Sequence, residues 1–241
     1  MRERYVCLTF DTLAARVGST PAGAYGPSDD DWAGALRDAV AASSVGRTTT
    51  PDAVRPHLDL PWHHPDRMHA DRRGEDWWRH HESAFADALA AVDVPRRQAD
   101  AVARGVREAY LDPTAWAAVE DANTALDRLS GAGWKPVVYL NGPPEVETLL
   151  ATVGLDDRVH EAFTSALTGY ELPHARAFET VEDALGDCRL WFAGRDPAGA
   201  AGALDLGIPG IVVAPDADAA LPPGARSVAT LDGVADLLDG N

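Results

Sequence analysis

Residues 5–10, YVCLTF, form a short apolar run that ends at Asp11. A run of this length and composition is typical of a buried strand. Further runs of the same kind occur in the second half of the chain, at residues 136–140 (PVVYL), 189–193 (RLWFA) and 210–214 (GIVVA), with a shorter one at 162–167. Helical patterns follow or separate them, at residues 143–153, 175–185, 196–206 and 231–238. This alternation predicts an α/β protein with a parallel sheet covered by helices on both faces.

The first strand is separated from the other strands by about 95 residues without a comparable run. Helical patterns in this part cover residues 32–42, 75–92 and 95–110, and we also expect a helix at 114–129. We therefore predict a Rossmann-like core from residues 1–16 and 112–241, with an all-helical cap inserted at 17–111. In an open parallel sheet the site lies at the carboxyl ends of the strands. These ends are Asp11, Asn141–Gly142 and Gly194–Arg195–Asp196.

Charge and composition narrow the classes of partner. The chain has 38 acidic and 21 basic residues, a net charge of −17, and Lys135 is its only lysine. Such a surface disfavours nucleic acid and anionic membranes as partners. It fits either a GC-rich genome or adaptation to high salt. No apolar run is long enough to span a membrane, and two cysteines, Cys7 and Cys188, do not form a disulfide framework. We expect a cytoplasmic protein with buried free thiols.

Five segments, taken in order, resemble the haloacid dehalogenase (HAD) superfamily, in the branch with a helical cap after the first strand. Residues 9–13 (TFDTL) are similar to its first motif, and residues 75–85 (EDWWRHHESAF) to a common cap helix. The second, third and fourth motifs correspond to residues 139–150 (YLNGPPEVETLL), 169–179 (GYELPHARAFE) and 192–213 (FAGRDPAGAAGALDLGIPGIVV). The resemblance covers nearly the whole chain and implies a Rossmann-like HAD core with a helical cap.

The resemblance implies a nucleophilic aspartate at Asp11, which would form a covalent intermediate with its substrate. In phosphatases of this superfamily Mg²⁺ neutralises charge, a Ser or Thr and a Lys bind the transferred group, and a second Asp moves protons. The candidate residues are then Asp11, Asn141 and Arg195 for catalysis, Asp11 and Asp196 for Mg²⁺, and Thr12, Gly142 and Gly194 for contact with a ligand.

Several motif positions depart from the phosphatase pattern. Leu13 stands where the proton-transferring Asp is expected, and Leu140 stands where the Ser or Thr is expected. Leu172, or Glu171 in a register shifted by one, replaces the Lys. In the fourth motif Arg195 and Gly199 occupy the positions of acids, with Asp196 one step displaced. Arg195 could supply the missing positive charge or form an ion pair with Asp11.

These departures predict a HAD-like hydrolase family member whose catalysis is weak or lost and which binds a small-molecule ligand or a protein partner. The first alternative is an active Mg²⁺-dependent phosphatase of small phosphate esters with Asp11 as nucleophile. A haloacid dehalogenase ranks behind it, because dehalogenases need neither the metal nor the acid at Leu13 but keep the Ser and the Lys.

Other conspicuous residues have a simpler interpretation. His80 and His81 are adjacent on a predicted helix and point about 100° apart, and His63, His64 and His69 match no zinc spacing, so we interpret these histidines and His57 as polar surface of the cap. For Trp62, Trp77 and Trp78, packing within the cap or against the core is favoured over a ligand cleft. Solvated loop charge is favoured for Arg72 and Arg73 over contact with an anionic ligand. The helix N-terminus after Gly194 could hold an anion, or its small residues could serve close packing.

Overall fold

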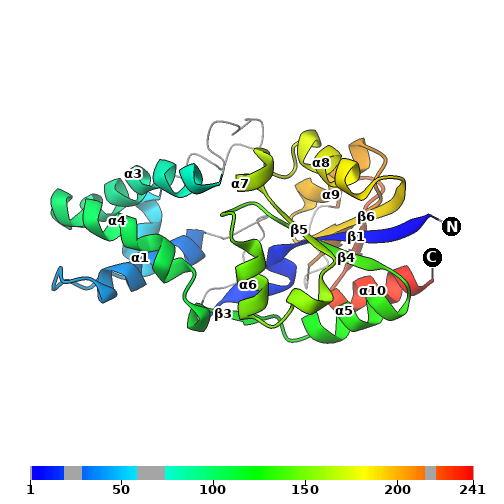
Figure 1. Cartoon of the computed structure of the whole chain (residues 1–241), viewed down its shortest axis with the longest axis horizontal. Coiled ribbons are helices and arrows are strands. Elements are labelled where there is room, and N and C mark those ends of the chain that lie inside the picture. Colours follow the sequence, from blue (N-terminus) through cyan, green and yellow to red (C-terminus); the bar gives the residue numbers. More distant parts are fainter. Residues whose placement is uncertain (1, 19–28, 59–73, 215–220, 241) are drawn as a thin grey trace.

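Six parallel strands form one sheet in the order β5-β4-β1-β6-β7-β8 (Figure 1). The computed structural model describes residues 2–18, 29–58, 74–214 and 221–240. The strands are β1 (Glu3–Thr9), β4 (Lys135–Leu140), β5 (Glu161–Thr164), β6 (Cys188–Gly194), β7 (Gly210–Val213) and β8 (Arg226–Val228). The apolar run that opens the chain is thus the central strand, between β4 and β6, and the predicted parallel α/β sheet is confirmed.

Alternation along β1 divides the sheet into two buried faces. Val6 and Leu8 pack with helices α5 (Ala122–Gly131), α6 (Val146–Thr152) and α10 (Leu231–Asp239). Tyr5 and Cys7 pack with α8 (Ala175–Leu185) and α9 (Pro197–Asp205) on the other face. Figure 1 shows these two layers on opposite sides of the sheet. Period-two alternation explains why both sets of strand residues are apolar.

The helices between residues 17 and 112 gather to one side of the sheet (Figure 1). They are α1 (Asp29–Ala42), α2 (Pro51–Val54), the short 3₁₀ helix η2 (Arg55–His57), α3 (Glu75–Ala91) and α4 (Arg96–Tyr110). The fully buried Trp32 lies at their centre, stacked on Tyr110 with ring centroids 4.5 Å apart. Tyr110 contacts Trp116 at 5.1 Å, and Trp116 contacts Phe10 at 5.6 Å. Aromatic packing therefore runs from the helices to the end of β1. The boundaries of the predicted cap, 17–111, stay a prediction.

The segment that leads from the sheet to these helices and the segment that returns from them form a two-stranded antiparallel sheet. β2 (Ala14–Arg16) follows the 3₁₀ turn η1 (Phe10–Thr12) and is antiparallel to β3 (Trp116–Ala118). The helix expected at 114–129 is therefore wrong in its first part: η3 (Pro113–Ala115) and β3 come first, and α5 begins only at Ala122. Pairing with a segment about 100 residues away overrides the local helical pattern here.

Two smaller differences lie near the sheet edges. The strand expected at 162–167 ends at Thr164, and the chain continues directly into the short helix α7 (Ser165–Thr168). The 3₁₀ turn η4 (Asp156–Arg158) precedes this strand. β8 was not predicted, because its three residues carry no apolar run. Cys7 is buried and Cys188 only half-buried, and neither forms a disulfide. Within the described ranges, no helix is both long and apolar enough to cross a membrane.

Candidate functional site

The predicted site residues lie at the carboxyl edge of the sheet. The register places Leu8 opposite Ala193 of β6 and Thr9 opposite Tyr139 of β4. The residues that follow these strands are therefore neighbours, because parallel strands end at the same edge. A hydrogen bond of 2.9 Å from Arg195 Nε to the main-chain oxygen of Asp11 joins the first of these ends to the last.

Asp11 lies in the turn η1 with its side chain buried. Both of its carboxyl oxygens lack a hydrogen-bond partner in the part of the chain that the structure describes. Burial raises the pKa of Asp11 to about 7, although the Thr9 hydroxyl and the positive charge of Arg195 lower it. The charge of Asp196 adds to the upward shift. Burial therefore favours the uncharged acid form of Asp11 well above the pH at which an exposed aspartate ionises.

Arg195 does not form the ion pair with Asp11 that we considered from the sequence. Its Nε donates to the Asp11 carbonyl, and both oxygens of the Asp11 carboxyl lack a hydrogen-bond partner among the described residues. The arginine therefore fixes the backbone of the turn. The charge of Arg195 acts on the Asp11 carboxyl without a direct contact. Burial therefore remains the largest influence on the pKa of Asp11.

Asn141 connects the second motif to the third. Its Nδ2 donates to the carbonyl of Leu172 at 2.9 Å, and its Oδ1 accepts from the Leu172 amide at 2.8 Å. The amide of Gly142 donates to Ser165 Oγ at 3.0 Å, and its carbonyl accepts from the Ala166 amide at 3.2 Å. Both residues thus join β4 to segments that follow β5, and these contacts give them a structural role.

Thr12 and Gly194 also have structural contacts. Thr12 Oγ1 is buried and donates to the Thr9 carbonyl at 2.7 Å, closing the turn around Asp11. A Cβ at Gly194 would lie 2.8 Å from Phe192 Cζ and 2.9 Å from Thr9 Cγ2. The absence of a side chain at Gly194 therefore serves close packing of β6 against β1, which is the packing alternative considered from the sequence.

The residues at this edge do not fit a Mg²⁺ site. Asp196 is the N-cap of α9, and its Oδ1 accepts from the Ala198 amide at 2.8 Å. Asp11 is the only other acid of the predicted pair, and the described ranges contain no group of three or more His, Cys, Asp or Glu that could hold a metal ion. Mg²⁺ requires well-placed, ionised oxygen ligands in octahedral geometry. One buried carboxyl group and one carboxylate that already caps α9 beside an arginine are a poor set of ligands for this ion.

The sequence did not indicate that Glu171 is buried, nor which residues the half-buried Glu145 contacts. Glu171 is 3% exposed, and burial raises its pKa to about 8. Glu145, in the loop after Gly142, accepts from the indole of Trp78 at 3.0 Å and pairs with Arg107 at 2.6 Å. The Trp78 and Arg107 side chains come from α3 and α4, so Glu145 joins the helical region to the second-motif loop. The sequence offered no signal for contacts at such separation.

The tryptophans of α3 are packed inside the protein as expected, whereas His81, expected on the surface, is buried. Trp77 and Trp78 are buried and contact Trp32, which agrees with the packing interpretation. His81 is 2% exposed, with its Nδ1 2.5 Å from the Trp77 carbonyl oxygen, so its interpretation as cap surface is wrong. Its ring faces the tryptophan layer on the inner side of the helix. Trp62, His63, His64, His69, Arg72 and Arg73 lie outside the described residues.

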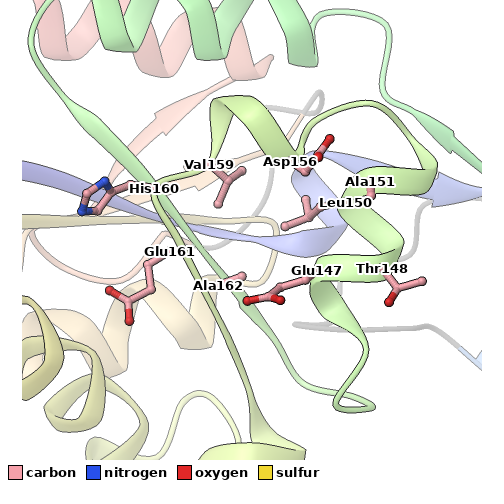
Figure 2. A pocket seen from close by; sticks show the side chains of 9 residues that line it. All are labelled: Glu147, Thr148, Leu150, Ala151, Asp156, Val159, His160, Glu161 and Ala162. Atoms are coloured by element: carbon pink, nitrogen blue, oxygen red, sulfur yellow. The ribbon is translucent and has the colours of Figure 1, made fainter.

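A cavity of about 460 Å³ lies between α6, η4 and β5 (Figure 2). Its lining includes three acids, Glu147, Asp156 and Glu161, together with His160. None of the predicted site residues lines it. The cavity is therefore separate from the edge that carries Asp11.

No family model matches the sequence, and no curated protein matches it. Solved structures match over essentially the full length. The L-2-haloacid dehalogenase from Xanthobacter autotrophicus aligns with a TM-score of 0.66 and 18% identity, over 100% of this chain and 99% of that chain. A Thermotoga maritima protein assigned as a β-phosphoglucomutase aligns with a TM-score of 0.69 and 12% identity, over 99% of each chain.

A third match is the Bacillus subtilis protein YfnB, assigned as a HAD hydrolase and bound to magnesium, with a TM-score of 0.68 and 15% identity over 99% of each chain. Identity at this level establishes a common fold and leaves chemistry to the residues. Together with the six-stranded sheet and the helices inserted after β1, these matches confirm the expected architecture: the chain has a HAD-like fold.

Proposed function

We propose that this chain is a HAD-fold binding protein in which Asp11 no longer acts as the nucleophile of Mg²⁺-assisted phosphoryl transfer. The observation that carries the proposal is the state of the Asp11 carboxyl group. It is buried, has no hydrogen-bond or ion-pair partner among the described residues, and has a pKa of about 7. A nucleophilic aspartate must be ionised and must reach its substrate, and the burial of both Asp11 oxygens opposes ionisation and contact alike.

The surroundings of Asp11 supply little compensation for charge on a transferred phosphoryl group. Such a group carries negative charge that must be met by cations or by preorganised donors. Leu140 and Leu172 stand at the positions of the usual donor and lysine, and Arg195 Nε is bonded to the Asp11 carbonyl. The charge of Asp196 further disfavours an anion beside Asp11. We infer that the chain binds a small-molecule ligand or a protein partner and does not transfer a phosphoryl group at Asp11.

The strong negative charge of the whole chain supports the same choice of partner. At −17, the surface repels nucleic acid and anionic membranes, and we propose neither as a partner. The alternatives from the family resemblance are a Mg²⁺-dependent phosphatase and, behind it, a haloacid dehalogenase. Both require Asp11 to act as a carboxylate nucleophile, so a single substitution tests both.

The experiment measures phosphate release from a panel of small phosphate esters with Mg²⁺, and halide release from 2-haloacids without it. The intact wild type is compared with Asp11→Asn between about pH 6 and pH 9, in low and high salt, because ionised Asp11 increases through this window. We expect no release above that of the variant. Release by the wild type that Asp11→Asn abolishes would overturn the proposal and make Asp11 a working nucleophile.

A further inference from the structure

A cavity of about 450 Å³ lies at the amino ends of β1 and β6. Asp11 follows the other end of β1, so the length of this seven-residue strand, about 20 Å, separates the cavity from the candidate site. The cavity has the size of a small-molecule site, for which roughly 300–1,000 Å³ is typical. It shares no lining residue with the predicted site or with the cavity of Figure 2.

The lining of this cavity is mainly basic, although the molecule as a whole is strongly acidic. Three arginines, Arg2, Arg4 and Arg189, line the cavity against a single acid, Glu182, in a chain of net charge −17. The register pairs Arg4 of β1 with Arg189 of β6, so their side chains lie on the same face of the sheet. An acidic chain that concentrates arginines around one cavity creates a local attraction for anions.

Two of the arginines are held in place by an aromatic ring. Arg4 lies over the Trp134 ring at 5.2 Å and donates to the Ala132 carbonyl at 2.5 Å, while Arg189 lies 5.7 Å from the same ring. Arg2 pairs with Asp187 at 2.9 Å, but both side chains are largely exposed. Exposed pairs contribute little to stability, so Arg2 can exchange this partner for a bound anion at small cost.

The rest of the wall is apolar. Leu190, Trp191 and Ile208 are nearly buried, and Leu206 is exposed at 37%. Trp191 Nε1 is buried and makes no hydrogen bond within the described ranges, which leaves one unused donor in a residue of the wall. Apolar walls with a few polar groups at one end suit an amphipathic ligand.

The backbone of β6 is open at the same place. β7 begins at Gly210, opposite Phe192, whose amide donates to the Pro209 carbonyl at 2.9 Å. Alternate residues of a strand direct their backbone groups to the same side, so the polar groups of Leu190 point toward the 206–209 turn. Pro209 has no N–H to donate to the Leu190 carbonyl. The strand edge beside the cavity is therefore available to a ligand.

We propose that this cavity binds a small organic anion, with a carboxylate or phosphate head group at the arginines on one face of the sheet and an apolar body that passes the open edge of β6 to reach Leu190, Leu206 and Ile208 on the other. The site is independent of the function proposed for Asp11. Binding there would use charge-assisted hydrogen bonds at the rim and burial of apolar surface along the wall.

Cys188 provides a local reporter for the test. It lines the cavity and is half-buried, whereas Cys7, the other cysteine, is buried within the sheet. The rate of Cys188 alkylation by iodoacetamide is measured by mass spectrometry on the intact chain, with octanoate or octyl phosphate as the probe. Octanol and inorganic phosphate serve as matched probes that lack the head group or the apolar body.

We expect saturable protection of Cys188 by both amphipathic anions and none by octanol or inorganic phosphate at the same concentrations. Arg2→Gln and Arg189→Gln should each weaken the protection about tenfold, the loss expected for one charge-assisted hydrogen bond. Leu206→Ser, at an exposed position, should also weaken the protection of Cys188 by octanoate. Two control variants should show the same protection of Cys188 as the wild type. They are Arg79→Gln, which removes an exposed charge on α3, and Asp11→Asn.

Equal protection by octanol would identify an apolar crevice without anion recognition and would overturn the proposal. Protection that is unchanged in both cavity arginine variants, or absent for both anions, would do the same. Because Asp11→Asn leaves this readout untouched, failure here is distinguishable from failure of the function proposed for the Asp11 site.

Discussion

At Asp11, burial and ionisation oppose each other. The pKa is 3.8 in an exposed aspartate and about 7 in the folded chain, so the folded state binds this proton more tightly. The contribution of Asp11 to the stability of the wild type therefore falls as pH rises from about 4 to 7 and then stays at the lower level. Asp11→Asn should be about as stable as the wild type near pH 4 and more stable above pH 7, by up to about 4 kcal/mol.

Urea unfolding of both proteins across this pH range measures the difference. Asp156→Asn in η4 is the matched control, because Asp156 is exposed and its replacement should leave the pH profile unchanged. A difference between wild type and Asp11→Asn that is constant with pH would show that Asp11 ionises normally. That result would also remove the main support for the function proposed for this site.

Gly194 illustrates a close approach that tolerates no side chain. A Cβ there would lie within 3 Å of Phe192 Cζ and Thr9 Cγ2 at the end of the central strands. Gly194→Ala should lower the free energy of unfolding by about 1–3 kcal/mol. Gly105→Ala in α4 is the control, since nothing lies within 4 Å of its new Cβ, and it should raise stability by about 0.5–1 kcal/mol. Equal effects of the two substitutions would contradict the packing role of Gly194.

Residue-level reasoning from the sequence located Asp11, Asn141 and Arg195 at one sheet edge but not their partners. A strand end can be read from a local apolar pattern. The contact of Arg195 with a main-chain oxygen, and the burial of Glu171 and His81, depend on segments that meet only in the folded chain. Local patterns carry no information on such contacts, which is why the ion pair considered for Asp11 was wrong.

At the scale of elements, Glu145 links α3 and α4 to the loop after β4. Its carboxylate accepts from the buried Trp78 indole and pairs with Arg107, which also contacts Glu75 on the surface. Glu145→Ala leaves the indole N–H without a partner and should lower stability by about 2 kcal/mol. Glu75→Ala, which removes only the exposed second partner of Arg107, should change the stability by less than about 1 kcal/mol.

A double-mutant cycle with Arg107→Ala, read by urea unfolding, separates the pair from other effects. We expect a coupling energy of about 1 kcal/mol between Glu145 and Arg107, within the usual range for residues in one network. If Glu145→Ala is no more damaging than Glu75→Ala, the link does not hold the helical region against the loop.

The strongest periodic segments were predicted well at this scale. Helix α8 matches its predicted bounds, and β1, β4, β6 and β7 differ by a residue or two. These elements bury a whole face or a whole strand, so their patterns are long and regular. β2, β3 and β8 have three residues each and owe their conformation to a partner strand. A segment of that length cannot show a period, and a helical pattern prevailed in our reading of residues 114–129.

For the whole molecule, the balance of charge governs the response to salt. The described ion pairs are mostly exposed, and the 38 acidic residues exceed the 21 basic ones. Acidic side chains therefore repel one another across the surface at neutral pH, and this repulsion destabilises the compact state. Potassium chloride screens it within a Debye length of about 10 Å at 0.1 M. Screening of exposed ion pairs opposes this gain, but each such pair contributes little.

We therefore expect the melting temperature at neutral pH to rise by several degrees between low salt and about 1 M potassium chloride. The control is the same titration near the isoelectric point of about 4.7, where the net charge is close to zero and the rise should largely disappear. A melting temperature that is flat or falling with salt at neutral pH would mean that the exposed ion pairs outweigh the general repulsion. The acidic composition would then favour a GC-rich genome over adaptation to a salt-rich interior as its origin.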